Sequence, residues 1–317
     1  MLEPTYGQAI TGAWRLVWHH KTLWVLGLLS IAVGHFGLNT FVGMLLNLAD
    51  ANFLLASWWP ENAPVITVSG SEGLLWVVWL CLVLGAVAIF VAVVAVLSQG
   101  ALIAASGEWF RKRSSPNMSR AWRKGVKHFW RLLGVDLIQK VLLGGVLIIL
   151  ALLLRGISTE TTQGFLLVVI ISTVGLLFAV AISSSTIYAA GYVVEKELPL
   201  GQALVEGWRM FEHHLLVSTE MSLVLLVLNL AVLALVFFGS VLTIAPTLIL
   251  SLIAGFTGSG ALIALSVTVG GFLLVLFIAL CGALFNALTV SAWMYLFMKM
   301  HHRGVTSRIL HWLKFAR

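Results

Sequence analysis

Charge is scarce in this sequence. Charged residues make up 10% of its 317 positions, against about 25% in soluble domains. No Asp, Glu, Lys or Arg occurs between residues 221 and 298, and hydrophobic residues supply 60% of the chain. Polar segments long enough for a soluble domain are missing. The composition therefore predicts an all-α, polytopic helical membrane protein that forms a single membrane domain over residues 1–317.

Cysteine, proline and catalytic motifs are also rare. The 2 cysteines both lie in apolar runs without metal-ligand spacing, which excludes a disulfide framework and a zinc signature. The 6 prolines and 29 glycines suit closely packed helices in lipid. The His pairs at 19–20, 213–214 and 301–302 are poor chelates, because adjacent helical side chains point about 100° apart. Without a nucleophile motif or a phosphate loop, we expect no enzyme activity, no cofactor and no metal.

An internal repeat organises the chain. Residues 7–20 and 201–214 match at seven of fourteen positions, and a looser third copy covers 119–132. Each copy is a short amphipathic segment that leads into a long apolar run. A fixed pattern of this kind predicts tandem structural units. The predicted units cover residues 5–110, 117–196 and 199–299, followed by a basic amphipathic tail at 300–317.

Each unit is expected to contain an interfacial helix, a span outward, a loop and a longer span back. Apolar runs of about 20 residues or more predict six spans, at residues 22–48, 73–107, 132–154, 164–194, 215–239 and 261–298. A further span between the last two would place the basic tail opposite the other basic segments, against the positive-inside bias. We therefore expect Ser240–Gly260 to be a re-entrant or surface-lying segment, broken by Pro246, Gly255 and Gly258.

Of the 19 Lys and Arg residues, 17 lie in four segments, 1–21, 108–131, 195–214 and 299–317, while Lys140 lies within a predicted span and Arg155 on the opposite face. Six spans place these segments on one face, which predicts a protein of the cytoplasmic (inner) membrane with both termini cytoplasmic. Basic amphipathic helices favour anionic lipid of the cytoplasmic leaflet over nucleic acid as a partner. The expected lipid contacts are Trp14, Arg15, Lys21, Arg120, Arg123, Lys124, Lys127, Arg131, Trp208, Arg209, Arg308 and Lys314.

Small residues concentrate near the ends of the three returning spans, at 99–107, 183–191 and 282–292. Such residues let helix backbones approach closely. We expect these three helices to pack together as a pseudo-threefold core.

Polar residues inside the predicted spans are the candidate functional groups, because they are costly in lipid. Asp136, Gln139, Lys140 and Glu220 are predicted to line a pocket for a headgroup or an ion. The alternative is structural: Asp136 and Lys140, at i and i+4, neutralise each other while Lys140 reaches the interface. Uncharged polar residues in spans are expected to form hydrogen bonds between helices. They are His35, Asn39, Asn47, Asn229 and Asn286.

The segment Ala9, Trp14-Arg15, His20-Lys21 and Leu23 to Leu29 resembles a group of prokaryotic multipass proteins. Ala203 and Trp208-Arg209 provide a second instance. The group includes the membrane domain that precedes the catalytic barrel of some glycerophosphodiester phosphodiesterases, and related families of unknown function. The barrel and its metal-binding acids do not occur in this sequence. The resemblance therefore implies a membrane module without catalysis.

Together these features predict a non-catalytic membrane scaffold, or an accessory subunit of a membrane complex. Its partners would be lipids and other membrane subunits, or further copies of the chain. A transporter or lipid-handling protein is the alternative, using the pocket at Asp136 and Glu220. The membrane part of an enzyme encoded elsewhere is a third possibility.

Overall fold

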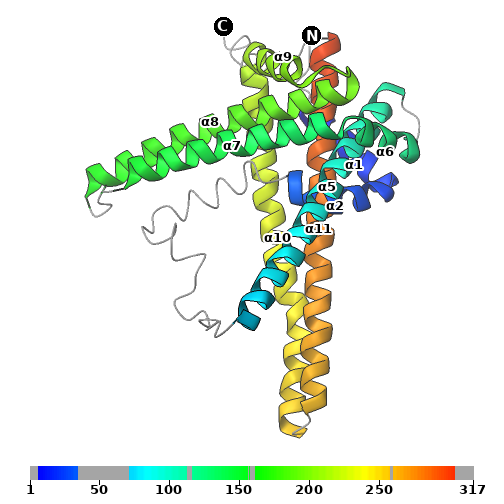
Figure 1. The fold of residues 1–317 in the computed structure, drawn as a ribbon, viewed down its shortest axis with the longest axis vertical. Helices are drawn as coiled ribbons and strands as arrows, with labels where there is room; N and C mark the ends of the chain where they lie inside the picture. Colours follow the sequence, from blue (N-terminus) through cyan, green and yellow to red (C-terminus); the bar gives the residue numbers. More distant parts are fainter. Residues whose placement is uncertain are drawn as a thin grey trace. The chain divides into compact units, whose positions relative to one another are not determined.

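The computed structural model describes residues 6–34, 71–112, 116–155, 157, 161–257 and 260–303. Every regular element in these ranges is an α-helix, which confirms the all-α part of the predicted fold class. The elements in order are α1 (Tyr6–His19), α2 (Thr22–Gly34), α5 (Ser71–Lys112), α6 (Met118–Lys127), α7 (Phe129–Leu154), α8 (Thr162–Glu195), α9 (Leu200–His213), α10 (Leu215–Thr257) and α11 (Gly260–Arg303) (Figure 1).

Within the described residues, α5, α7, α8, α10 and α11 are the helices long and apolar enough to cross a membrane. These five helices agree with the predicted polytopic membrane architecture. The first predicted span begins with α2, whose apolar part covers only Thr22–Ile31. Its continuation over 35–48 lies outside the described residues, so the sixth span stays a prediction.

The chain divides into two compact units. The α10–α11 unit contains α1, most of α2, α5 from Ala101, α6 up to Arg123, and α10–α11. The α7–α8 unit contains α5 up to Gly100, α6 from Lys124, and α7 to α9. Each unit is therefore described by its own contacts.

In the α10–α11 unit, α10 and α11 form a long hairpin (Figure 1), and α1 packs on α11. Gly27 of α2 lies directly against the Ala283 carbonyl of α11. Beside this contact, Asn286 Nδ2 donates to Gly27 O at 2.9 Å and to Ser30 Oγ at 2.8 Å. The predicted interhelical role of Asn286 is confirmed by these two bonds.

In the α7–α8 unit, α7 and α8 form a second hairpin, and α9 packs on α8. Leu143, Leu150 and Ala179 form the buried core of the hairpin. Gly175 of α8 has no space for a side chain because it lies against Leu150.

The small-residue stretches meet partners of more than one kind. Ser106 Oγ of α5 and Ser291 Oγ of α11 lie 3.0 Å apart, so two of the predicted core helices pack directly. The stretch on α8 is covered by α9, whose Gly207 lies against Ser185 and Ala189. The three-helix core stays a prediction.

The expected breaks at Pro246 and Gly255 are wrong, whereas Gly258 lies outside the described residues. Helix α10 runs without interruption from Leu215 to Thr257, with Pro246 inside it. Proline is tolerated in such helices where a neighbouring helix and Ser or Thr side chains support the backbone. Thr247 supplies both: its side chain lies against Gly270 of α11, and its hydroxyl donates to Ile244 O at 2.6 Å.

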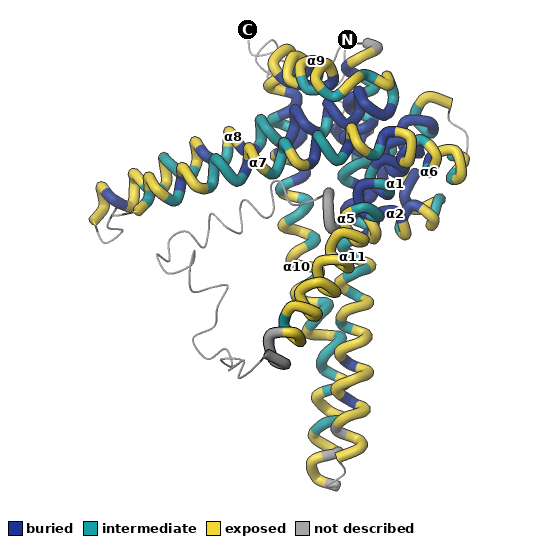
Figure 2. The backbone as a smooth tube through the Cα atoms, viewed as in Figure 1, coloured by how far each residue is buried: buried dark blue, intermediate teal, exposed yellow. Residues whose placement is uncertain are grey.

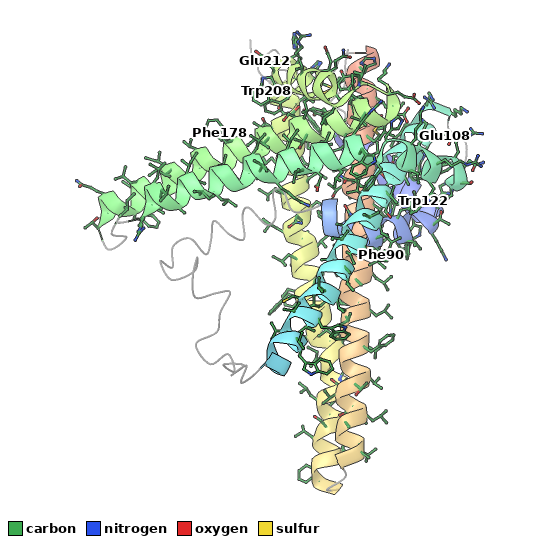
Figure 3. All side chains as sticks on the ribbon, viewed as in Figure 1. Phe90, Glu108, Trp122, Phe178, Trp208 and Glu212 are labelled. Carbon is green, nitrogen blue, oxygen red and sulfur yellow. The ribbon has the colours of Figure 1, made fainter. Side chains whose placement is uncertain are left out.

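Exposure changes along the long helices (Figure 2). On α11, large apolar side chains are exposed up to Leu280, and burial begins at Ala283. Helices α5 and α8 show the same order: Phe90 and Phe178 project from the exposed parts (Figure 3), and the following small-residue stretches are buried.

Helix α9 offers a matched test of close packing. A Cβ at Gly207 would lie 2.6 Å from Ser185 O and 2.8 Å from Ala189 N, whereas Gly201 has nothing within 4 Å. Gly207→Ala should cost about 1–3 kcal/mol by overpacking. Gly201→Ala should be neutral or stabilise by up to about 1 kcal/mol through helix propensity. Thermal unfolding of the detergent-purified variants measures both, and equal melting temperatures would contradict the packing.

Candidate functional site

A cluster of charges ties α6 and α7 to the turn between α8 and α9. Lys127 Nζ lies 2.7 Å from Glu197 Oε2, and Lys124 Nζ lies 3.3 Å from Glu195 Oε1. Arg131 Nη1 donates to the Glu197 carbonyl at 2.9 Å. We call this group, with the adjacent His128, the Glu197 cluster. Its ion pairs link two segments that lie some 70 residues apart in the sequence.

Local backbone geometry places the Glu197 side chain in this cluster. Helix α8 ends at Glu195, and Glu197 then adopts a left-handed backbone with φ 57°. Glycine or asparagine is usual at such a helix end, and another residue there costs about 1–2 kcal/mol. In this conformation the Glu197 carboxylate contacts Lys127. The contact lowers the pKa of the Glu197 carboxyl.

His128 is the buried member of the Glu197 cluster, at 2% exposure. Within the described residues neither ring nitrogen has a hydrogen-bond partner, and Nε2 lies 3.8 Å from Glu197 Oε1. Burial lowers the pKa of His128, and the charges of Lys124, Lys127 and Arg131 lower it further against the opposing carboxylate of Glu197. The structure therefore holds His128 in its neutral form.

The predicted lipid-contacting cations fall into two groups. Arg120 pairs with Glu108 at 3.0 Å and Arg209 with Glu206 at 3.1 Å, and Lys124, Lys127 and Arg131 belong to the Glu197 cluster. The protein itself thus engages most of these side chains.

A second group keeps its charge available. Among the described residues, Arg15, Lys21 and Arg123 have no acidic partner, and Trp14 and Trp208 are about half exposed. The remaining two predicted contacts, Arg308 and Lys314, lie outside the described residues.

The predicted polar pocket is resolved only in part. Asp136 and Lys140 form an ion pair of 2.7 Å on α7, with the Asp136 side chain 11% exposed. Gln139 lies on the same helix, in the α7–α8 unit, whereas Glu220 lies on α10, in the α10–α11 unit. The geometry agrees with mutual neutralisation of Asp136 and Lys140, and a pocket that also includes Glu220 stays a prediction.

The first histidines of two pairs, His19 and His213, contact carbonyls of their own helices, whereas His20 contacts the Trp109 ring of α5. His19 Nδ1 lies 2.8 Å from Arg15 O, and His213 Nδ1 lies 2.8 Å from Arg209 O, at matching positions of the repeat. Among the described residues, no group of three His, Cys, Asp or Glu side chains is placed to hold a metal ion. His35, Asn39 and Asn47 lie outside the described residues.

Sequence reasoning missed the Glu197 cluster. The sequence places Glu195 and Glu197 at the start of the basic segment 195–214 and indicates no partner for them. The available signal was the pairing of an acidic turn with a strongly basic segment. Comparison of the chain with protein-family models, with curated proteins and with solved structures finds no match.

The buried His128 predicts a pH dependence. The unfolded chain binds a proton near pH 6.5, whereas the folded chain binds it only below the lowered pKa of His128. Folding stability should therefore fall as pH decreases through and below 6.5, by at most about 1.4 kcal/mol per pH unit for one proton. His128→Met, which introduces the residue found at matching position 210, should reduce this slope in pH-dependent thermal unfolding to the part contributed by His20, whose pKa is also lowered by burial and by His19.

His213→Gln on the exposed face of α9 is the control and should keep the slope. Glu197 does not confound the measurement above pH 5, because its pKa is lowered from 4.5 and its contribution is lost only at more acid pH. An unchanged slope in His128→Met would show that another group titrates.

Proposed function

We propose that this chain is a multispan protein of the prokaryotic cytoplasmic membrane that serves as a non-catalytic scaffold or accessory subunit. Its amphipathic helices α1, α6 and α9 would lie at the cytoplasmic leaflet, with both termini on that side. A family relation to the membrane domain of glycerophosphodiester phosphodiesterases is part of the proposal, and rests on the sequence motif alone.

The observation that carries the proposal is the length of the exposed apolar part of each returning helix. In α5, α8 and α11 the run of mainly buried residues begins at Ala95, Ser183 and Ala283, which lie 24, 21 and 23 residues after the first residue of the helix. At 1.5 Å per residue this is about 32–36 Å, close to the hydrocarbon thickness of about 30 Å. The exposed parts would be the spans, and the buried ends would continue beyond them into a cytoplasmic head.

The three amphipathic helices support a tandem arrangement. Each buries one residue, the fourth after it and the seventh after it: Ala9, Ala13 and Leu16 in α1; Ala121, Gly125 and His128 in and after α6; Ala203, Gly207 and Met210 in α9. The matched carbonyl contacts of His19 and His213 add a second local similarity.

The packing partners of these helices follow a regular order along the chain. Helix α9 packs on α8, the returning helix before it, and Gly125 of α6 lies 3.0 Å from a Cβ position on Gly100 of α5. Helix α1, which has no returning helix before it, packs on α11, the last one. This order favours three repeat units in which each interfacial helix packs on the returning helix of a different repeat.

A scaffold role fits this arrangement better than transport. The transport alternative depends on an available polar pocket at Asp136 and Glu220, and the Asp136 carboxylate is already held by Lys140. The large exposed apolar side chains of α5, α7, α8, α10 and α11 instead provide faces for lipid and for other membrane subunits.

Topology is testable with cysteine labelling. In a chain with Cys81 and Cys281 replaced by serine, Phe256→Cys places a thiol at the α10–α11 tip, where Phe256 is 92% exposed. Arg123→Cys places one on α6. A membrane-impermeant maleimide should label residue 256 in intact spheroplasts and residue 123 only after permeabilisation. Labelling of both from one side would contradict the proposed topology.

The scaffold role predicts stable association. Purification of the tagged chain from its native membrane in lipid nanodiscs should recover a second membrane protein, or more than one copy of this chain, in defined proportion. Mass spectrometry of the particles identifies the partner, and the same tag on an unrelated multispan protein is the control. Recovery of a single copy with lipid alone would contradict the subunit hypothesis.

A further inference from the structure

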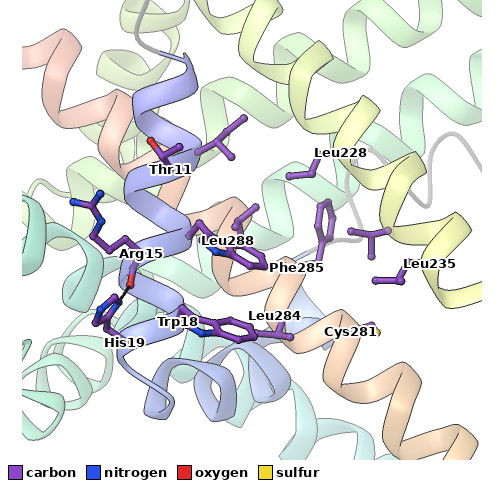
Figure 4. Close-up of a pocket in the computed structure, with 13 residues that line it drawn as sticks. Thr11, Arg15, Trp18, His19, Leu228, Leu235, Cys281, Leu284, Phe285 and Leu288 are labelled. Atoms are coloured by element: carbon purple, nitrogen blue, oxygen red, sulfur yellow. Dashed lines mark hydrogen bonds between the residues drawn. The ribbon is translucent and has the colours of Figure 1, made fainter. Parts of the chain in front are cut away.

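The α10–α11 unit contains an apolar groove that no part of the described chain fills. It encloses about 540 Å³ between α1, α10 and α11, within the range of about 300–1,000 Å³ typical of ligand sites. Its floor is formed by aliphatic and aromatic side chains, with polar groups confined to the α1 side (Figure 4). The floor residues are Leu228, Val232, Leu235, Leu284, Phe285 and Leu288.

The rim of the groove is polar and aromatic. Trp14 and Trp18 stack with ring centroids 5.3 Å apart and an interplanar angle of 13°. Arg15 and His19 lie at the edge and point away from the apolar floor (Figure 4). His19 uses Nδ1 toward the Arg15 carbonyl, which leaves its other ring nitrogen facing outward.

Depth along the hairpin places the groove at a membrane boundary. The groove lining begins on α10 at Leu235, 22 residues before Thr257, and on α11 at Cys281, 21 residues after Gly260. Both separations correspond to about 32–33 Å from the hairpin tip. With the tip at the far interface, the groove lies where about 30 Å of hydrocarbon gives way to headgroups, the depth that tryptophan favours.

The internal repeat shows what is unusual about Arg15. Its counterpart Arg209 on α9 pairs with Glu206 at 3.1 Å. The position that matches Glu206 in α1 is Gly12, so the α1 copy lacks the acid. Within the described residues Arg15 has no acidic partner, and it lies beside an apolar groove at the depth of lipid phosphates.

We infer that this groove is a binding site for one anionic glycerophospholipid. One acyl chain lies along the floor formed by α10 and α11, the stacked Trp14 and Trp18 cover its upper part, and Arg15 holds the phosphodiester. His19 adds a donor or acceptor at the rim. The inference rests on the proposed membrane orientation and gives the proposed lipid contacts one defined, stoichiometric site.

The arginine distinguishes this site from ordinary lipid solvation. Any open apolar groove in a membrane contacts acyl chains, but selection for an anionic headgroup requires a fixed charge. A basic residue at an anionic surface contributes about fivefold in affinity. The selectivity should therefore depend on Arg15 and not on Arg209, whose charge is already neutralised by Glu206.

Native mass spectrometry of the full chain in mild detergent tests this directly. Phosphatidylglycerol and phosphatidylcholine with identical acyl chains are titrated separately. One phosphatidylglycerol should bind about fivefold more tightly than phosphatidylcholine. Arg15→Gln should abolish the difference, and the matched Arg209→Gln should retain it. Val232→Phe, which fills the floor, should weaken both lipids.

Three results would overturn the inference: equal affinity for the two lipids, equal loss of selectivity in Arg15→Gln and Arg209→Gln, or full lipid binding by Val232→Phe. Glycerol phosphate, which lacks the acyl chains, should bind at least about tenfold more weakly, and equal binding would assign the site to a free phosphate compound. Correct cysteine topology with no lipid selectivity rejects only the groove. Failed topology rejects the membrane orientation itself.

Discussion

Close contact between small residues is the constraint on which the rest of this structure depends. At Gly207, Gly100 and Gly27 an added Cβ would meet the backbone of another helix. Lipid surrounds apolar helices as favourably as other apolar helices do, so their association depends on van der Waals fit and hydrogen bonds rather than on hydrophobic burial. The bonds of Asn286 to α2, and of Ser106 to Ser291, occur where such backbones approach. Close approach fixes the helix positions, and polar groups fix their register.

Much of the helical framework could be predicted from periodicity, but one element could not. The positive-inside argument required an even number of helices between residues 215 and 303, and the structure has two, α10 and α11. The position of the turn was wrong because Pro246 was read as a break. Only the packed partner, with Thr247 against Gly270, shows why the helix continues. A proline in the sequence is a local signal, whereas its effect on a helix depends on the tertiary contacts around it.

In the candidate site, too, contacts between sequence neighbours could be predicted and contacts between distant residues could not. The pairing of Asp136 with Lys140 follows from their i,i+4 spacing and was available from the sequence. The Glu197 cluster was not, because about 70 residues separate its acids from its bases. A basic segment read by itself suggests an anionic surface. Because Glu195 and Glu197 neutralise part of the charge of this segment, fewer of its cations are available for lipid than the sequence predicts.

Differences between the copies of the repeat are therefore more informative about function than their similarities. The shared small faces explain how each amphipathic helix packs, while Glu206 of α9 and Gly12 of α1 determine whether the matched arginine is neutralised by the protein. An arginine at the edge of the hydrocarbon layer is unfavourable without a counter-charge. Where the chain provides no carboxylate, the anion present at that depth is the lipid phosphate. Under the proposed lipid site, the difference between Glu206 and Gly12 would give the matched arginines different roles in the same kind of helix, a structural one in α9 and a binding one in α1.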